Sequence, residues 1–75
     1  MENMKIEINE FQPVEEICKE LERLGYRKGT MIPAPSVVAT WDFLKIYSCY
    51  CLNDSQMFDH PTYTTLEELK KMERN

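Results

Sequence analysis

Two hydrophobic periods mark the first third of the chain. Apolar and polar residues alternate over residues 4–8, which predicts a short strand with one apolar face. A stripe at helical spacing then predicts a helix over residues 13–24; its members are Val14, Ile17, Cys18, Leu21 and Leu24. Pro13 suits the first helical position, and Gly25 suits the residue after the helix, because glycine adopts a left-handed backbone at little cost.

The middle of the chain has less regular patterns. Residues 26–30 predict the beginning of a strand or a turn. Residues 31–36 predict an exposed loop or sheet edge, because Pro33 and Pro35 each remove a backbone donor. Residues 43–52 carry aromatic and β-branched side chains, which predict a strand with bulky residues on both faces.

The last third predicts a turn, a returning strand and a helix. Turn-forming residues occupy positions 53–55, and residues 56–63 predict a partner strand that Pro61 interrupts. Either of two pairs has the capping-box spacing that starts a helix: Thr64 with Glu67, or Thr65 with Glu68. The side chains expected to dock this helix are Leu66, Leu69 and Met72.

The element order is strand, helix, two or three strands, helix. In a chain of 75 residues this order predicts one α+β domain over residues 1–75. We expect a small antiparallel sheet of three to four strands with two helices packed on one face. A domain this short has a modest core, so a homodimer or a bound partner would add stability.

The formal net charge is −4, with acids in excess at both ends and bases in excess over residues 25–53. An acidic protein disfavours duplex DNA, because neutralisation of phosphates supplies most non-specific affinity for DNA. Acidic surfaces suit basic partners, including proteins that bind nucleic acids. Solubility alone is the simpler explanation of the same charge.

The start of the chain is too polar for a secretory signal, and the uncharged stretch over residues 29–41 is too short for a membrane span. Three cysteines, an odd number, argue against a secreted disulfide framework. We therefore expect a cytoplasmic protein that does not enter a membrane.

Few groups suited to catalysis converge in the sequence. Cys49 and Cys51 would share one face of a strand, and with Cys18 and His60 they offer the ligands of a zinc site. Packing of Cys18 as a small apolar residue is the competing interpretation. The sequence has no second cysteine pair and no glycine-rich phosphate-binding loop, and it marks no two carboxylates as an acid–base pair. We therefore expect neither an enzyme nor a cofactor. A small zinc-binding protein is one alternative.

A second alternative is a pocket for a nucleotide-derived small molecule. Arg27 or Lys28 could hold a phosphate. Aromatic side chains could stack on a base; the candidates are Trp41, Phe43, Tyr47 and Tyr50. The competing interpretation is that Trp41 and Phe43 complete the core and that both basic residues are solvated.

Two short motifs resemble those of small bacteriophage and prophage accessory proteins. The first is Leu-x-x-Leu-Gly-Tyr after an N-terminal helix, here Leu21, Leu24, Gly25 and Tyr26. The second is Tyr-x-x-Thr-Leu-Glu-Glu-Leu near the end, which this chain approaches with one residue fewer after the tyrosine: Tyr63, Thr64, Thr65, Leu66, Glu67, Glu68 and Leu69. The resemblance implies stoichiometric binding to host machinery, such as a bacterial defence system, in the cytoplasm of the host cell.

Taken together, these features lead us to expect an inhibitor or modulator that binds a basic surface of a host protein. The expected contact is either the acids near the C-terminus or an acidic face of the first helix, made by Glu15, Glu16, Glu20 and Glu22. Electrostatic attraction would guide the encounter, and aromatic side chains would supply most of the affinity.

Overall fold

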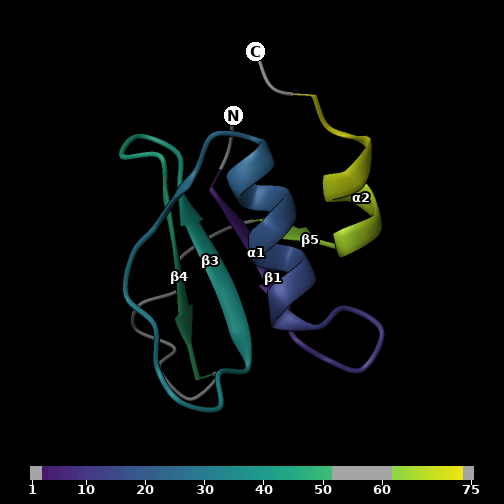
Figure 1. Ribbon diagram of the computed structural model, residues 1–75, viewed down its shortest axis with the longest axis vertical. Coiled ribbons are helices and arrows are strands. Elements are labelled where there is room, and N and C mark those ends of the chain that lie inside the picture. Colours follow the sequence, from purple (N-terminus) through teal and green to yellow (C-terminus); the bar gives the residue numbers. More distant parts are fainter. Residues whose placement is uncertain (1–2, 52–61, 74–75) are drawn as a thin grey trace.

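A computed structural model describes residues 3–51 and 62–73, which form one five-stranded sheet and two helices (Figure 1). In chain order the elements are β1 (Met4–Glu7), α1 (Val14–Arg23), β2 (Arg27–Lys28), β3 (Val37–Trp41), β4 (Ile46–Tyr50), β5 (Thr62–Thr64) and α2 (Leu66–Lys71). The strands lie in the order β2-β4-β3-β1-β5. Within the described residues, neither helix is long and apolar enough to cross a membrane.

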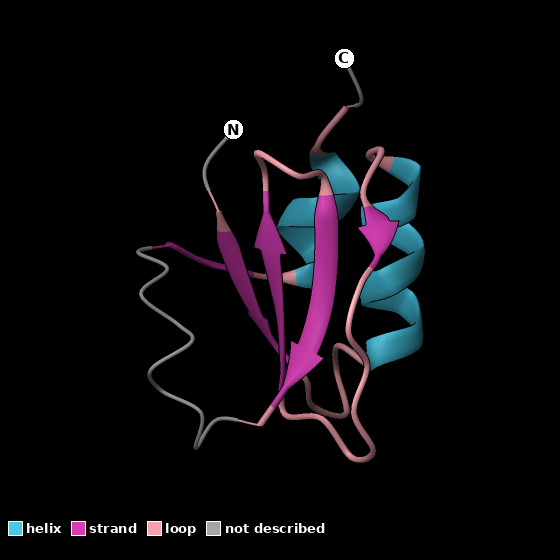
Figure 2. Ribbon diagram, turned by 90° about the vertical axis from the view of Figure 1, so that its left-hand side faces the viewer, coloured by secondary structure: helices cyan, strands magenta, loops and turns pink. Residues whose placement is uncertain are grey.

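The α+β class is confirmed, and both helices lie on one side of the sheet (Figure 2). The sheet differs from the expected three to four antiparallel strands, because it has five strands and is mixed. β3 pairs antiparallel with β1 and β4, whereas β1 with β5 and β2 with β4 are parallel. Helix α1 returns the chain along the sheet, so β2 runs in the same direction as β1 and therefore parallel to β4. The predicted turn over residues 53–55 and residues 56–61 of the returning strand lie outside the described residues.

Helix α1 forms where the apolar stripe predicts it, one residue shorter at each end than residues 13–24. Ile17 and Leu21 are fully buried against the sheet. Pro13 is the N-cap with an extended backbone, rather than the first helical residue. Gly25 follows the helix with a φ of 102°, a left-handed conformation that favours glycine. Sequence-local signals therefore place this helix almost completely.

The β3–β4 hairpin is the largest departure from the sequence-based prediction. No strand is predicted over β3, and β4 is shorter than the strand predicted over residues 43–52. Residues 42–45 instead form the connecting turn. Asp42 O accepts from Lys45 N at 3.2 Å, its carboxylate accepts from Lys45 Nζ at 2.8 Å, and Lys45 adopts a φ of 55°. These contacts close the turn, so the strand predicted over residues 43–52 begins only at Ile46.

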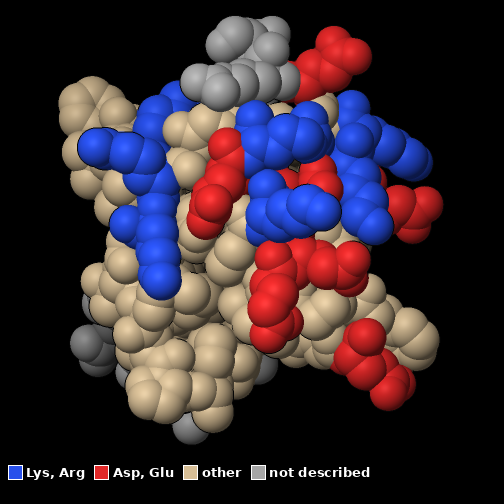
Figure 3. Space-filling model, in the orientation of Figure 1, with Lys and Arg blue, Asp and Glu red and all other residues tan. Residues whose placement is uncertain are grey.

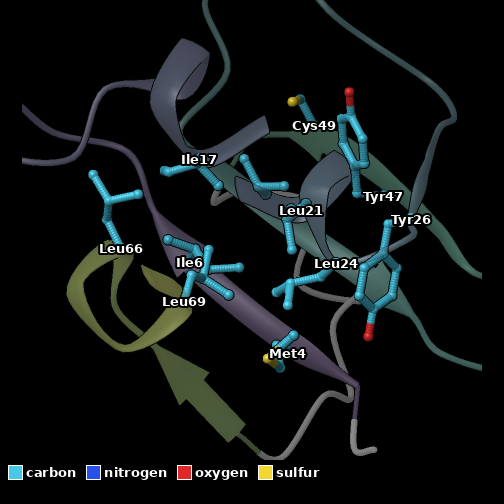
Figure 4. Packing of buried hydrophobic residues seen from close by; sticks show 11 residues of the cluster. Met4, Ile6, Ile17, Leu21, Leu24, Tyr26, Tyr47, Cys49, Leu66 and Leu69 are labelled. Carbon is cyan, nitrogen blue, oxygen red and sulfur yellow. The ribbon is translucent and has the colours of Figure 1, made fainter. Parts of the chain in front are cut away.

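The core lies between the sheet and the two helices (Figure 4). Its buried members are Met4, Ile6, Ile17, Leu21, Leu24, Tyr26, Val38, Tyr47, Cys49, Leu66 and Leu69. Trp41 and Phe43 do not belong to this cluster: Trp41 is half-buried and Phe43 is 96% exposed. The expectation that these two residues complete the core is therefore wrong.

Helix α2 begins with a side-chain cap, as its sequence predicts. Thr65 Oγ1 accepts from Glu68 N at 3.1 Å, so the second of the two Thr–Glu pairs starts the helix. Leu66 and Leu69 are buried, and Met72 packs against the core. Arg23 Nη2 of α1 donates to Leu69 O at 2.9 Å, which ties the C-terminal end of α1 to α2.

Candidate binding surface

The four acids expected to form one face lie on two sides of α1. Glu22 accepts from the Tyr47 hydroxyl of β4, whereas Glu20 binds Arg23 Nε at 2.7 Å on the side that reaches α2. Glu15 and Glu16 are both exposed, but 100° per residue separates them around the helix. Two of the four carboxylates thus serve contacts within the fold, and no single face of α1 presents all four.

Charge on the helix layer is divided along the helices rather than between them. Figure 3 shows acidic side chains mainly in the lower part of this face and Lys and Arg side chains above them. Both helices have acids in the first turn and bases in the last turn: Glu15, Glu16, Glu67 and Glu68 against Arg23, Lys70 and Lys71. This arrangement complements the helix dipoles, so it has a structural cause that needs no partner.

The four residues offered as a nucleotide pocket are divided by the sheet. Trp41 pairs with Ile46 and Thr40 pairs with Tyr47, so Trp41 and Tyr47 point to opposite faces. Tyr47 belongs to the core beneath the helices. The parallel register places Arg27 on the face of Ile46 and Lys28 on the face of Tyr47. Arg27 and Trp41 therefore share the helix-free face, and Tyr47 and Lys28 do not join them there.

A groove of about 290 Å³ lies on the helix-free face. We call it the aromatic groove. It is lined by Gly29, Thr30, Trp41, Leu44, Ile46, Ser48 and Tyr50. The rings of Trp41 and Tyr50 pack edge to face, with centroids 5.8 Å apart and planes at 71°. Ser48 Oγ accepts from Thr30 N at 2.8 Å, which fixes the floor of the groove to the strand edge.

The turn beside the aromatic groove exposes two large apolar side chains. Phe43 is 96% and Leu44 is 54% exposed, although β-turns ordinarily carry Gly, Asn, Asp or Ser. Asp42 and Lys45 close the turn through their side chains, and the turn leaves the side chains of Phe43 and Leu44 exposed. Aromatic and large aliphatic residues that are exposed next to a groove are typical of surfaces that bind other molecules.

Tyr47, Glu22 and two thiols form a polar cluster on the opposite, helix-covered face. Burial raises the pKa of the Cys49 thiol to about 12 and raises that of Cys18 above its ordinary value. Burial, followed by the hydrogen bond to Glu22, raises the pKa of Tyr47. All three groups therefore stay protonated near neutral pH. A protonated thiol is a poor nucleophile and a poor metal ligand, so this cluster is suited to packing.

The zinc alternative gains no support from the described part of the chain. Cys18 and Cys49 lie close enough to interact, but no group of three or more His, Cys, Asp and Glu residues suited to a metal ion occurs among the described residues. Cys51 is half-buried at the end of β4. His60 lies outside the described residues.

Sequence reasoning named Trp41, Tyr50 and Arg27, and these three share one face, but it did not name Leu44 or Ser48 of the groove. Alternation along residues 44–50 places Leu44, Ile46 and Tyr50 on one face. Alternation does not show which face the helices cover, and both described helices pack on the other one (Figure 2). A scan against known protein families, a search of curated proteins and a search of solved structures found no match to this chain, so the resemblance to phage accessory proteins stays a prediction.

Proposed function

We propose that this protein acts by stoichiometric, non-catalytic binding to another protein, and that the binding surface is the aromatic groove together with the Phe43–Leu44 turn. The observation that carries this proposal is the near-complete exposure of Phe43 at the turn beside the groove. Burying an apolar side chain contributes about 1.5–3 kcal/mol, so leaving it exposed in so small a domain forgoes a large stabilisation. A partner that covers Phe43 and Leu44 would gain this burial free energy on binding.

Composition of the surface supports a protein partner. Trp, Tyr, Phe and Arg are the side chains enriched at protein interfaces, and Trp41, Tyr50, Phe43 and Arg27 meet on or beside one face. The turn projects Phe43 outward, where it can enter a pocket of the partner as an anchor. Inhibition or modulation of a host protein by such contacts is the function that this proposal carries forward from the phage resemblance.

The experiment compares capture of partners from a bacterial lysate by three forms of the protein. Changing Phe43 and Leu44 together to Ser removes the anchor at exposed positions, so the fold should persist, and capture should fall at least about tenfold. Phe11→Ser is the matched control, because Phe11 is also a largely exposed phenylalanine, at 82%, but lies between β1 and α1. Equal capture by all three forms would refute the proposal.

A third variant tests the acidic surface expected from the sequence. Reversing Glu15 and Glu16 to Lys changes two exposed charges without touching Glu20 or Glu22, which serve internal contacts. On the present proposal this variant keeps its captured proteins. If it loses them while the Phe43 and Leu44 variant retains them, helix α1 is the interface and the sheet face is not.

A second candidate function is binding of a nucleotide-derived small molecule in the same groove. The observation that favours it is that Trp41, Tyr50 and the exposed Arg27 share one face, which would let a base stack and a phosphate pair with guanidinium. A thermal-shift panel of cyclic and ADP-ribose-type nucleotides tests it, since a tight ligand raises the melting temperature by mass action. The rise in melting temperature should disappear in Arg27→Ala. If no nucleotide of the panel raises the melting temperature, binding of these nucleotides is excluded.

A further inference from the structure

Strand β2 forms one border of the sheet, next to β4. Arg27 N donates to Lys45 O at 2.7 Å and Gly29 N donates to Tyr47 O at 2.7 Å, so these two residues turn their N–H groups inward. The residue between them, Lys28, faces the other way in the alternation of a parallel ladder. Its N–H and C=O are therefore directed outward, where they can pair with one further strand.

The side chains on this border determine which kind of strand it can accept. Arg27 and Lys28 are both exposed and lie on opposite faces of the sheet, so positive charge flanks the border on both sides. Figure 3 shows Lys and Arg side chains along this border of the molecule. A second copy of β2 would place like charges opposite one another, which is destabilising. A strand carrying Asp or Glu would form favourable cross-strand pairs instead.

The aromatic groove begins directly beside this border. Gly29 and Thr30, which continue from β2, form one wall of the groove, and Ile46 and Ser48 of β4 belong to its lining. Gly29 presents no side chain there, and a Cβ at this position would lie 2.5 Å from Ser48 Oγ. An added strand could therefore place an apolar side chain beside Gly29, at the end of the groove next to the border, while its neighbours on the other face meet Lys28.

We propose that the β2 border binds an extended acidic segment of a partner protein as a sixth strand, with alternate apolar side chains of that segment entering the aromatic groove. This inference rests on the proposed protein-binding function and specifies the chemistry of the partner. The main-chain bonds to Lys28 would supply affinity, and the groove together with the Lys28 side chain on the other face would supply selectivity.

Two synthetic peptides serve as probes, each of about seven residues, the length of an ordinary strand. One alternates Val with Glu, and the other alternates Val with Lys. Titrations are followed by the amide signals of the protein. The acidic peptide should bind and slow hydrogen exchange of the Lys28 amide, whereas the basic peptide should bind at least about fivefold more weakly. Equal binding of both peptides, or no binding of either, would overturn the inference.

The role of the border N–H is tested by changes at Lys28. Lys28→Pro removes a donor that points away from β4 and has no backbone partner among residues 3–51 and 62–73. Total synthesis with ligation at Cys18 and Cys49 permits an ester at the same position with the side chain unchanged. Each should weaken the acidic peptide about fivefold or more. The matched control Lys28→Ala keeps the N–H and should weaken binding only about twofold. Unchanged affinity in the ester form would refute strand addition.

Failure of this inference and failure of the proposed function are distinguishable. If capture of proteins from the lysate depends on Phe43 and Leu44 but the acidic peptide does not bind, strand addition is wrong and the binding surface stands. If the peptide binds the β2 border while capture is indifferent to Phe43 and Leu44, the border is a site and the proposed turn anchor is wrong.

Discussion

The contact between Tyr47 and Glu22 gives the sharpest test of how this fold uses its charged and aromatic residues. The sequence offered Tyr47 as a ligand-stacking ring and Glu22 as a partner-binding acid. The structure instead pairs them with each other, because the buried Tyr47 hydroxyl donates to the Glu22 carboxylate across the α1–β4 junction. Removing either partner should therefore change the stability of the free protein.

The expected magnitude follows from the burial of each group. A hydrogen bond to a charged group contributes about 1.5–3 kcal/mol when its loss leaves a buried group unsatisfied. Here Glu22 is exposed and can be hydrated once the phenol is gone, so we expect Tyr47→Phe to cost about 1 kcal/mol. The ring itself stays in place in this variant. Tyr47→Ala would in addition empty a core position and cost about 3–5 kcal/mol.

A double-mutant cycle isolates the contact from other effects of the two changes. Tyr47→Phe, Glu22→Ala and their combination are unfolded with urea and followed by fluorescence of Trp41, the single tryptophan. With a urea slope of about 1 kcal/mol per molar for a small protein, a loss of 1 kcal/mol lowers the midpoint by about 1 M. We expect a coupling free energy of about 1 kcal/mol between the two sites.

Glu15→Ala provides the matched control, because Glu15 is an exposed acid in the first turn of the same helix, seven residues before the Glu22 that accepts from Tyr47. Its cycle with Tyr47→Phe should give a coupling near zero. The reasoning is refuted if Glu22→Ala and Tyr47→Phe add to within about 0.3 kcal/mol, or if Glu15→Ala couples to Tyr47→Phe as strongly as Glu22→Ala does.

Three further predictions concern stability. Thr65→Ala removes the cap of α2 and should cost about 1 kcal/mol in urea unfolding, whereas Thr65→Ser should cost little. Gly29→Ala should lower the free energy of unfolding by about 1–3 kcal/mol, because the added Cβ would lie 2.5 Å from Ser48 Oγ. Combining it with Ser48→Ala should recover part of this loss, and additive effects of the two substitutions would contradict the explanation. Burial and the hydrogen bond to Asp42 raise the pKa of Tyr26 from 10.0 to about 12, so the folded form holds this proton longer. The stability that Tyr26 contributes should be complete below pH 10 and be lost up to pH 12, so Tyr26→Phe should make the decline over that range less steep.

Helix α1 shows what a local pattern can predict. Its stripe, its acidic first turn and the glycine after its end all act between residues a few positions apart, and the helix observed differs from the predicted one by one residue at each end. The Thr65 cap of α2 was found by the same kind of local signal. The candidate site was only half found, because Trp41, Tyr50 and Arg27 share one face while Tyr47 and Lys28, named with them, lie on the other.

The amino-acid sequence by itself determined the two helices, the first strand, the charge and the α+β class, because periodicity and capping depend on neighbours along the chain. Tertiary structure alone decided that β1 pairs with β5 and β2 with β4 in parallel, and that both described helices pack on the face of Tyr47 rather than on that of Trp41. Alternation tells which side chains share a face of a strand, but which face becomes buried depends on where distant helices pack. The exposure of Phe43 follows from the same cause, since a turn closed by Asp42 and Lys45 places it outside every layer.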